Sequence, residues 1–111
     1  MSVRLRKRFT LDVAACVAYL SEQNPAAAQR LVDELEETAL LLNVFPELGQ
    51  PRDELSPSLR AAKLRSFPYT AYYRIDGSDV VLVRLLHQAR DHRTFRFREE
   101  RVEFAAATSG E

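Results

Sequence analysis

The first half of the chain changes from an alternating pattern of apolar residues to a helical one. Val3 and Leu5 alternate with basic residues between Ser2 and Arg8, which predicts a half-buried strand. From about Phe9 the apolar positions fall on one helical stripe: Phe9, Val13, Cys16, Val17 and Leu20. A second stripe follows at Ala28, Leu31, Leu35, Ala39 and Leu42. Asn24-Pro25 separates the two stripes with a good N-cap and a residue suited to the first helical position, so we expect an antiparallel helical hairpin.

Turn residues and β-rich runs fill most of the second half. Residues 44–57 hold three prolines and a glycine, which predicts a loop, and residues 59–67 form a less regular strand that ends at a proline. Two further β-rich runs, 69–75 and 80–86, flank Asp76-Gly77 and predict a β-hairpin. Its second strand is almost wholly apolar, which is typical of a central strand.

The sequence therefore predicts an α+β fold in the order β-α-α-β-β-β, with an antiparallel-rich sheet and the N-terminal α-hairpin on one of its faces. We expect one domain over residues 1–104, with a short C-terminal strand or helix within residues 92–104, and a flexible tail over residues 105–111.

Alternation along the strands predicts which side chains face the helices. Leu31, Leu35 and Leu42 are expected to pack against the strand residues Val81, Val83, Leu85 and His87. His87 is then a hydrogen-bonded structural histidine at the end of its strand. The other face should be open and should carry these residues: Arg4, Arg6, Arg8, Tyr72, Arg74 and Arg84. Such a face suits an acidic protein partner, with direct nucleic-acid binding as the lesser alternative.

Composition and charge narrow the class of protein. A 46% apolar and 29% charged composition is that of a globular chain. Cys16 is the only cysteine, so an internal disulfide is excluded, and the two histidines form no metal-binding pattern, so no metal or cofactor is expected. No apolar run approaches the roughly 20 residues of a membrane span, and a cytoplasmic protein is expected. Net charge is zero, yet residues 10–55 carry −7 and residues 56–101 carry +5, so the charge is segregated.

Five segments between residues 3 and 91 resemble the ParE/RelE toxin superfamily, the toxins of type II toxin–antitoxin modules. They are Asn24-Pro-Ala-Ala-Ala, Phe45-Pro-Glu-Leu-Gly49, Leu59-Arg60, Tyr72-Tyr-Arg74 and Leu86-His-Gln-Ala-Arg-Asp91. Their order and spacing follow the superfamily, whose fold is a small sheet with an α-hairpin on one face.

The resemblance also implies two possible activities. RelE-type members cleave mRNA on the ribosome with lysines, arginines and a tyrosine, which neutralise the transition state and accept a proton. Only Lys63 and Arg90 match that set. The other positions fall at Ala61, at Thr70 and near Arg96, so we predict no ribosome-dependent mRNA cleavage.

A resemblance to the ParE branch implies a poison of DNA gyrase that has no catalysis of its own. The motif His87-x-x-Arg90-Asp91 is typical of that branch. The resemblance implies a ParD-like antitoxin that binds the toxin surface. Because the predicted open face is basic, we expect the antitoxin's C-terminal segment, extended or helical, to be net acidic near Arg74, Arg84 or Arg90, with apolar side chains in the groove between the helical hairpin and the sheet. A binding module that has lost toxicity stays open as a third hypothesis. The candidate target- or antitoxin-binding residues are Arg4, Arg6, Tyr72, Arg74, Arg84, Arg90 and Asp91.

Overall fold

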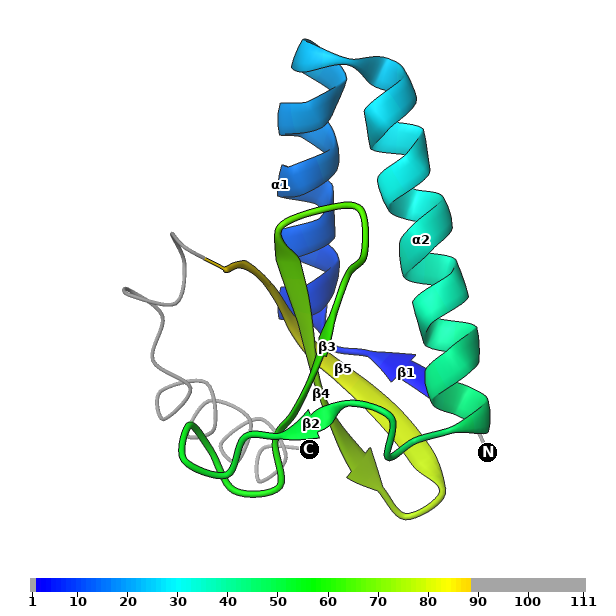
Figure 1. The fold of residues 1–111 in the computed structure, drawn as a ribbon, viewed down its shortest axis with the longest axis vertical. Coiled ribbons are helices and arrows are strands. Elements are labelled where there is room, and N and C mark those ends of the chain that lie inside the picture. Colours follow the sequence, from blue (N-terminus) through cyan, green and yellow to red (C-terminus); the bar gives the residue numbers. More distant parts are fainter. Residues whose placement is uncertain (1, 89–111) are drawn as a thin grey trace.

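A computed structural model describes residues 2–88 and confirms an α+β architecture (Figure 1). Two helices stand side by side as a hairpin and pack on a five-stranded sheet. The elements are β1 (Val3–Leu5), α1 (Lys7–Gln23), α2 (Pro25–Val44), β2 (Gln50–Pro51), β3 (Arg60–Lys63), β4 (Tyr69–Asp76) and β5 (Asp79–His87). The expected order β-α-α-β-β-β is confirmed, with the two-residue β2 added inside the predicted loop. The predictions for residues 92–104 and for the tail over residues 105–111 concern positions outside the described residues.

The strand order across the sheet is β1-β5-β4-β3-β2. β1 pairs with β5 in parallel, whereas the three other pairs of neighbours are antiparallel. The nearly all-apolar β5 is therefore an inner strand, as predicted. The β4–β5 turn has Gly77 as its first central residue, with a φ of 63°, a conformation that favours glycine.

The helical hairpin forms where the sequence predicts it, with one difference at its start. Asn24 caps α2 by accepting hydrogen bonds from the backbone N–H groups of Ala26 at 3.1 Å and Ala27 at 3.4 Å. α1 already begins at Lys7, because β1 ends at Leu5 and the chain turns at Arg6. The strand prediction for Ser2 to Arg8 was thus too long, and Arg8 lies on α1 instead of on a sheet face.

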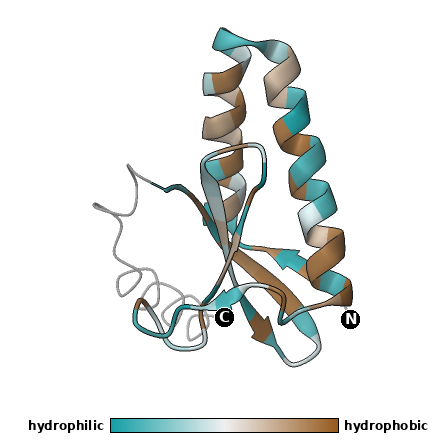
Figure 2. Ribbon diagram, viewed as in Figure 1, coloured by the Kyte–Doolittle hydropathy of each residue, from teal (hydrophilic) through white to brown (hydrophobic). Residues whose placement is uncertain are grey.

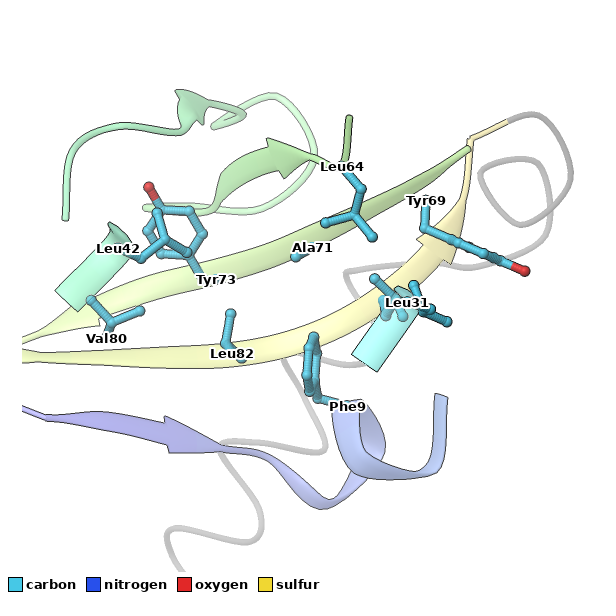
Figure 3. Close-up of a cluster of buried hydrophobic side chains, with 10 residues drawn as sticks. Phe9, Leu31, Leu42, Leu64, Tyr69, Ala71, Tyr73, Val80 and Leu82 are labelled. Carbon is cyan, nitrogen blue, oxygen red and sulfur yellow. The ribbon is translucent and has the colours of Figure 1, made fainter. Parts of the chain in front are cut away.

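A cluster of buried side chains joins the hairpin to one face of the sheet (Figure 3). Leu31 and Leu42 are fully buried in this cluster, and Leu35 packs against it half-buried. The β5 residues in the cluster are Val80, Leu82 and Leu85.

The prediction that Val81 and Val83 face the helices was therefore wrong. Tyr73 pairs with Leu82 while Tyr72 pairs with Arg84, so Val83 is the extra residue of a β-bulge, which changes the alternation of β5 at that point. Leu85, which follows the bulge, faces the helices as expected.

The second face of the sheet is covered at its centre, which contradicts the expectation of an open face there. Tyr72 is fully buried in a smaller cluster with Leu59, Ala61 and Leu86, and Leu55 packs against that cluster. Residues 52–59 thus lie over this part of the sheet. Tyr72 is therefore not available to a partner, contrary to its prediction as a binding residue.

The segment after α2 is fastened to the sheet by a buried tyrosine. The Tyr73 hydroxyl accepts a hydrogen bond from the Gly49 backbone N–H at 2.8 Å and donates one to the Pro46 carbonyl at 2.7 Å. A Cβ at position 49 would lie 2.7 Å from the Tyr73 ring and 2.8 Å from the Ala61 carbonyl oxygen, so only glycine fits this close approach. We call this arrangement the Tyr73 latch.

Tyr73→Phe should lower the free energy of unfolding by about 1–3 kcal/mol, because it leaves the Gly49 N–H and the Pro46 carbonyl without their protein partner. Urea unfolding of the two proteins measures this difference. Tyr19→Phe is the matched control, since Tyr19 is 55% exposed on α1 and should change stability by less than about 0.5 kcal/mol. If Tyr73→Phe lowers the urea midpoint no more than Tyr19→Phe does, the Tyr73 latch contributes nothing measurable to stability.

Candidate functional site

Arg4, predicted to lie on an open basic face, instead forms ion pairs with acidic residues at the tip of a hairpin. Arg4 on β1 contacts Asp76 at 2.7 Å and Asp79 at 3.4 Å, at the tip of the β4–β5 hairpin. Ser2 binds Asp79 with its hydroxyl at 2.9 Å and its backbone N–H at 3.2 Å. The Ser2 hydroxyl, its backbone N–H and Arg4 hold the pKa of Asp79 below its ordinary value. Two acidic side chains therefore offset the charge of Arg4, although its side chain is 52% exposed.

Arg84 does not lie on an open face, contrary to the prediction. Its guanidinium makes a two-pronged contact with the carboxylate of Asp12 on α1, at 2.7 and 3.0 Å. Asp12 also accepts a hydrogen bond from the Leu85 backbone N–H at 2.9 Å. The exposed fractions of the two side chains are only 12% and 17%. Arg84 therefore ties α1 to β5, which is a structural role.

The remaining predicted residues of the basic face do not form one cluster. Arg74 on β4 is half-buried and donates to the Ser56 hydroxyl at 2.5 Å, on the covering segment. Arg6 is half-buried at the start of α1, where its backbone N–H donates to the Leu82 carbonyl at 2.9 Å. Arg90 and Asp91 lie outside the described residues. The basic surface predicted from alternation is thus divided among separate contacts.

The positions that match RelE-type catalysis do not assemble a catalytic site within residues 2–88. Lys63 is exposed on β3 and pairs with Thr70, which is 2% exposed. Ala61 is buried against Tyr72, and burial raises the pKa of the Tyr72 hydroxyl above its ordinary value. A buried tyrosine of raised pKa is a poor proton acceptor. His87 packs edge-on against Tyr69, with ring centroids 5.7 Å apart, as suits a structural histidine.

An exposed apolar surface at the end of α2 was missed by the sequence analysis. Figure 2 shows apolar colouring over the last turns of α2 and the segment that follows. We call it the α2-end patch, and its members are between 36% and 68% exposed: Leu40, Leu41, Val44, Phe45, Leu48 and Ile75. Four of them, with Pro46 and Glu47, line a groove of about 540 Å³ between the end of α2 and β4. Large apolar groups exposed side by side are typical of a binding surface.

Within residues 2–88 no cluster of side chains suits a metal ion, and no helix is long and apolar enough to cross a membrane. Residues 2–88 thus form a small α+β domain with an α-hairpin on a mixed sheet and an exposed apolar groove at the end of α2. The protein-family model described as the ParE toxin of the type II toxin–antitoxin system parDE matches residues 3–92 of this chain. The chain belongs to this family and is a ParE-type toxin.

A curated relative agrees with this assignment, and a solved structure shares the fold. Toxin ParE3 of Caulobacter vibrioides is 38% identical over 61 residues, which cover 55% of this chain and 57% of that protein. The matched region thus spans little more than half the length of this curated relative. A solved structure described as the chromosomal ParDE TA system from P. aeruginosa has a TM-score of 0.69 at 22% identity, covering 78% of this chain and 95% of that one. This second likeness concerns the fold.

Proposed function

We propose that this toxin acts by binding DNA gyrase, without catalysis of its own, and that a cognate ParD-like antitoxin keeps it silent. The observation that carries the proposal is the match to the ParE family over residues 3–92, the whole described domain. The poor fit to a ribonuclease supports it, since Ala61 and Thr70 stand where RelE-type RNA cleavage uses a lysine and an arginine, and both residues are buried. A gyrase inhibitor acts where gyrase is, so we place the protein in the cytoplasm.

Induced expression of the full chain should reduce colony formation by orders of magnitude and should produce filamentous cells with DNA-damage signalling. The purified chain should inhibit gyrase supercoiling and trap the cleaved DNA–gyrase complex in vitro. Co-expression of the cognate ParD-like antitoxin should restore growth.

Other results would contradict the proposal in distinct ways. Rapid translation arrest with codon-specific mRNA cuts that vanish on Arg90→Ala would indicate a RelE-type ribonuclease. Expression of folded protein without any growth defect would indicate a binding module that has lost toxicity. Unchanged gyrase activity together with strong toxicity would place the target elsewhere.

A further inference from the structure

The exposed side of α1 carries a row of residues that takes no part in the core. Phe9 marks the core side of this helix, since it is buried in the cluster of Figure 3. Five exposed residues are turned to the opposite side by the helical repeat of about 3.6 residues per turn: Lys7, Leu11, Ala15, Ala18 and Glu22. We call them the α1 outer row. The row has a cation at one end, an anion at the other end and apolar side chains between them.

The middle of the α1 outer row is an apolar surface without charge. Leu11 is 57% exposed, and Tyr19, which flanks the row, is 55% exposed. Residues 13–21 contain no charged residue, whereas the exposed side of a helix normally carries charged and polar groups. The small side chains of Ala15 and Ala18 allow a second helix to approach closely, because the distance between packed helices depends on the side chains at the contact.

The charges at the two ends of α1 are placed against the helix dipole. The first turn holds Lys7 and Arg8 and no acidic residue, and the last turn holds Glu22 and no basic residue. A helix is stabilised by the opposite arrangement, with acidic groups near its N-terminus and basic groups near its C-terminus. Within residues 2–88 the side chains of Lys7 and Glu22 form no ion pair that would offset this. The helix therefore has an unfavourable charge at each end.

A second copy of the same helix, running antiparallel, supplies the favourable charges. Lys7 and Glu22 lie at equal distances from the midpoint of the row, as do Leu11 and Ala18. A two-fold axis at that midpoint places Lys7 of each copy opposite Glu22 of the other. Leu11 of each copy then packs on the small Ala18 of the other, with Tyr19 beside it. Each end of α1 thus receives from the second copy the sign of charge that stabilises it.

We propose that the α1 outer row is a self-association surface through which two copies of this chain form an antiparallel, two-fold dimer. The inference goes beyond the proposed function and does not depend on it. Opposite charges that meet across an interface favour association and fix its register. A contact confined to one helix of 17 residues is smaller than stable interfaces, which bury about 800 Å² on each partner. The dimer should therefore be weak, with a Kd of about 10–100 μM.

A charge swap tests the pairing of Lys7 with Glu22. Sedimentation equilibrium of the purified full chain over about 5–500 μM measures the Kd of the dimer. Lys7→Glu should raise this Kd about tenfold, because it places two acidic side chains opposite each other at both ends of the contact. Glu22→Lys should have the same effect through two basic side chains. The double variant Lys7→Glu/Glu22→Lys should return Kd to within about threefold of the unaltered value, because opposite charges face each other again.

Two further comparisons locate the contact on α1. Leu11→Lys should raise Kd about tenfold or more, whereas Leu40→Lys, the same substitution at a 68% exposed position of α2, should change it by less than about twofold. Glu36→Lys on the exposed side of α2 is the control for Glu22→Lys and should also change Kd by less than about twofold. Circular dichroism melting shows whether each variant is folded, and Tyr19→Lys replaces Leu11→Lys if the latter is not.

Four results would overturn the inference. A chain that stays monomeric up to about 500 μM has no such surface. A double variant that associates as weakly as the single variants contradicts the pairing of Lys7 with Glu22. Dissociation by Leu40→Lys without an effect of Leu11→Lys places the dimer contact on the α2-end patch. A monomeric chain whose inhibition of gyrase is lost in a folded Leu11→Lys variant assigns the α1 outer row to the cellular target.

Discussion

Arg84→Ala should lower the free energy of unfolding by about 3–5 kcal/mol, because it leaves the carboxylate of Asp12 mostly buried without its partner cation. Asp12 would keep only the Leu85 N–H at 2.9 Å, and the tie between α1 and β5 would be reduced to one hydrogen bond. Urea or thermal unfolding measures the change. Arg4→Ala is a suitable control, since Arg4 and Asp76 are 52% and 67% exposed and such pairs contribute about 0–1 kcal/mol.

A double-mutant cycle with Asp12→Ala separates the pair itself from the general effect of shortening each side chain. The coupling between Asp12 and Arg84 should exceed that between Arg4 and Asp76. If Arg84→Ala destabilises the protein no more than Arg4→Ala does, the contact is not a structural tie. An Arg84 variant can lose toxicity because it unfolds. Its stability must therefore be measured before the loss is attributed to a missing contact with a partner.

Leu31→Ala should lower the free energy of unfolding by about 2–5 kcal/mol, since Leu31 is fully buried between α2 and the sheet. The same substitution at Leu40 provides a close comparison, because it uses the same residue type on the same helix at 68% exposure. Leu40→Ala should change stability by less than about 0.5 kcal/mol. Chemical unfolding monitored by circular dichroism gives both values. Similar losses at both positions would contradict the assignment of the two sides of α2.

The features that the sequence predicts well are those determined by nearby residues. The helical stripes, the cap at Asn24 and the Gly77 turn each depend on a few neighbouring side chains, and all three are present in the structure. The α2-end patch could also have been found. Leu40, Leu41 and Val44 lie off the stripe that ends at Leu42, so their exposure follows from helical geometry.

The features that the sequence does not predict depend on residues far apart in the chain. The bulge at Val83 determines which β5 residues face the helices, and alternation alone cannot locate it. The covering of Tyr72 by residues 52–59 requires knowledge of how a proline-containing loop folds back. The contact between Asp12 and Arg84 joins residues 72 positions apart. Both errors in the candidate site, at Tyr72 and at Arg84, have such long-range causes.

The parallel pairing of β1 with β5 has a consequence for how the chain is made. β5 is the last described strand, yet it lies between β1 and β4 and completes the sheet. Ser2 and Asp79, which join β1 to β5, are 77 positions apart. While the ribosome is still adding the middle of the chain, the two helices can form from local contacts, but β1 has nothing to pair with. The sheet can close only when residues 79–87 have left the exit tunnel, so its formation requires the whole chain from β1 to β5.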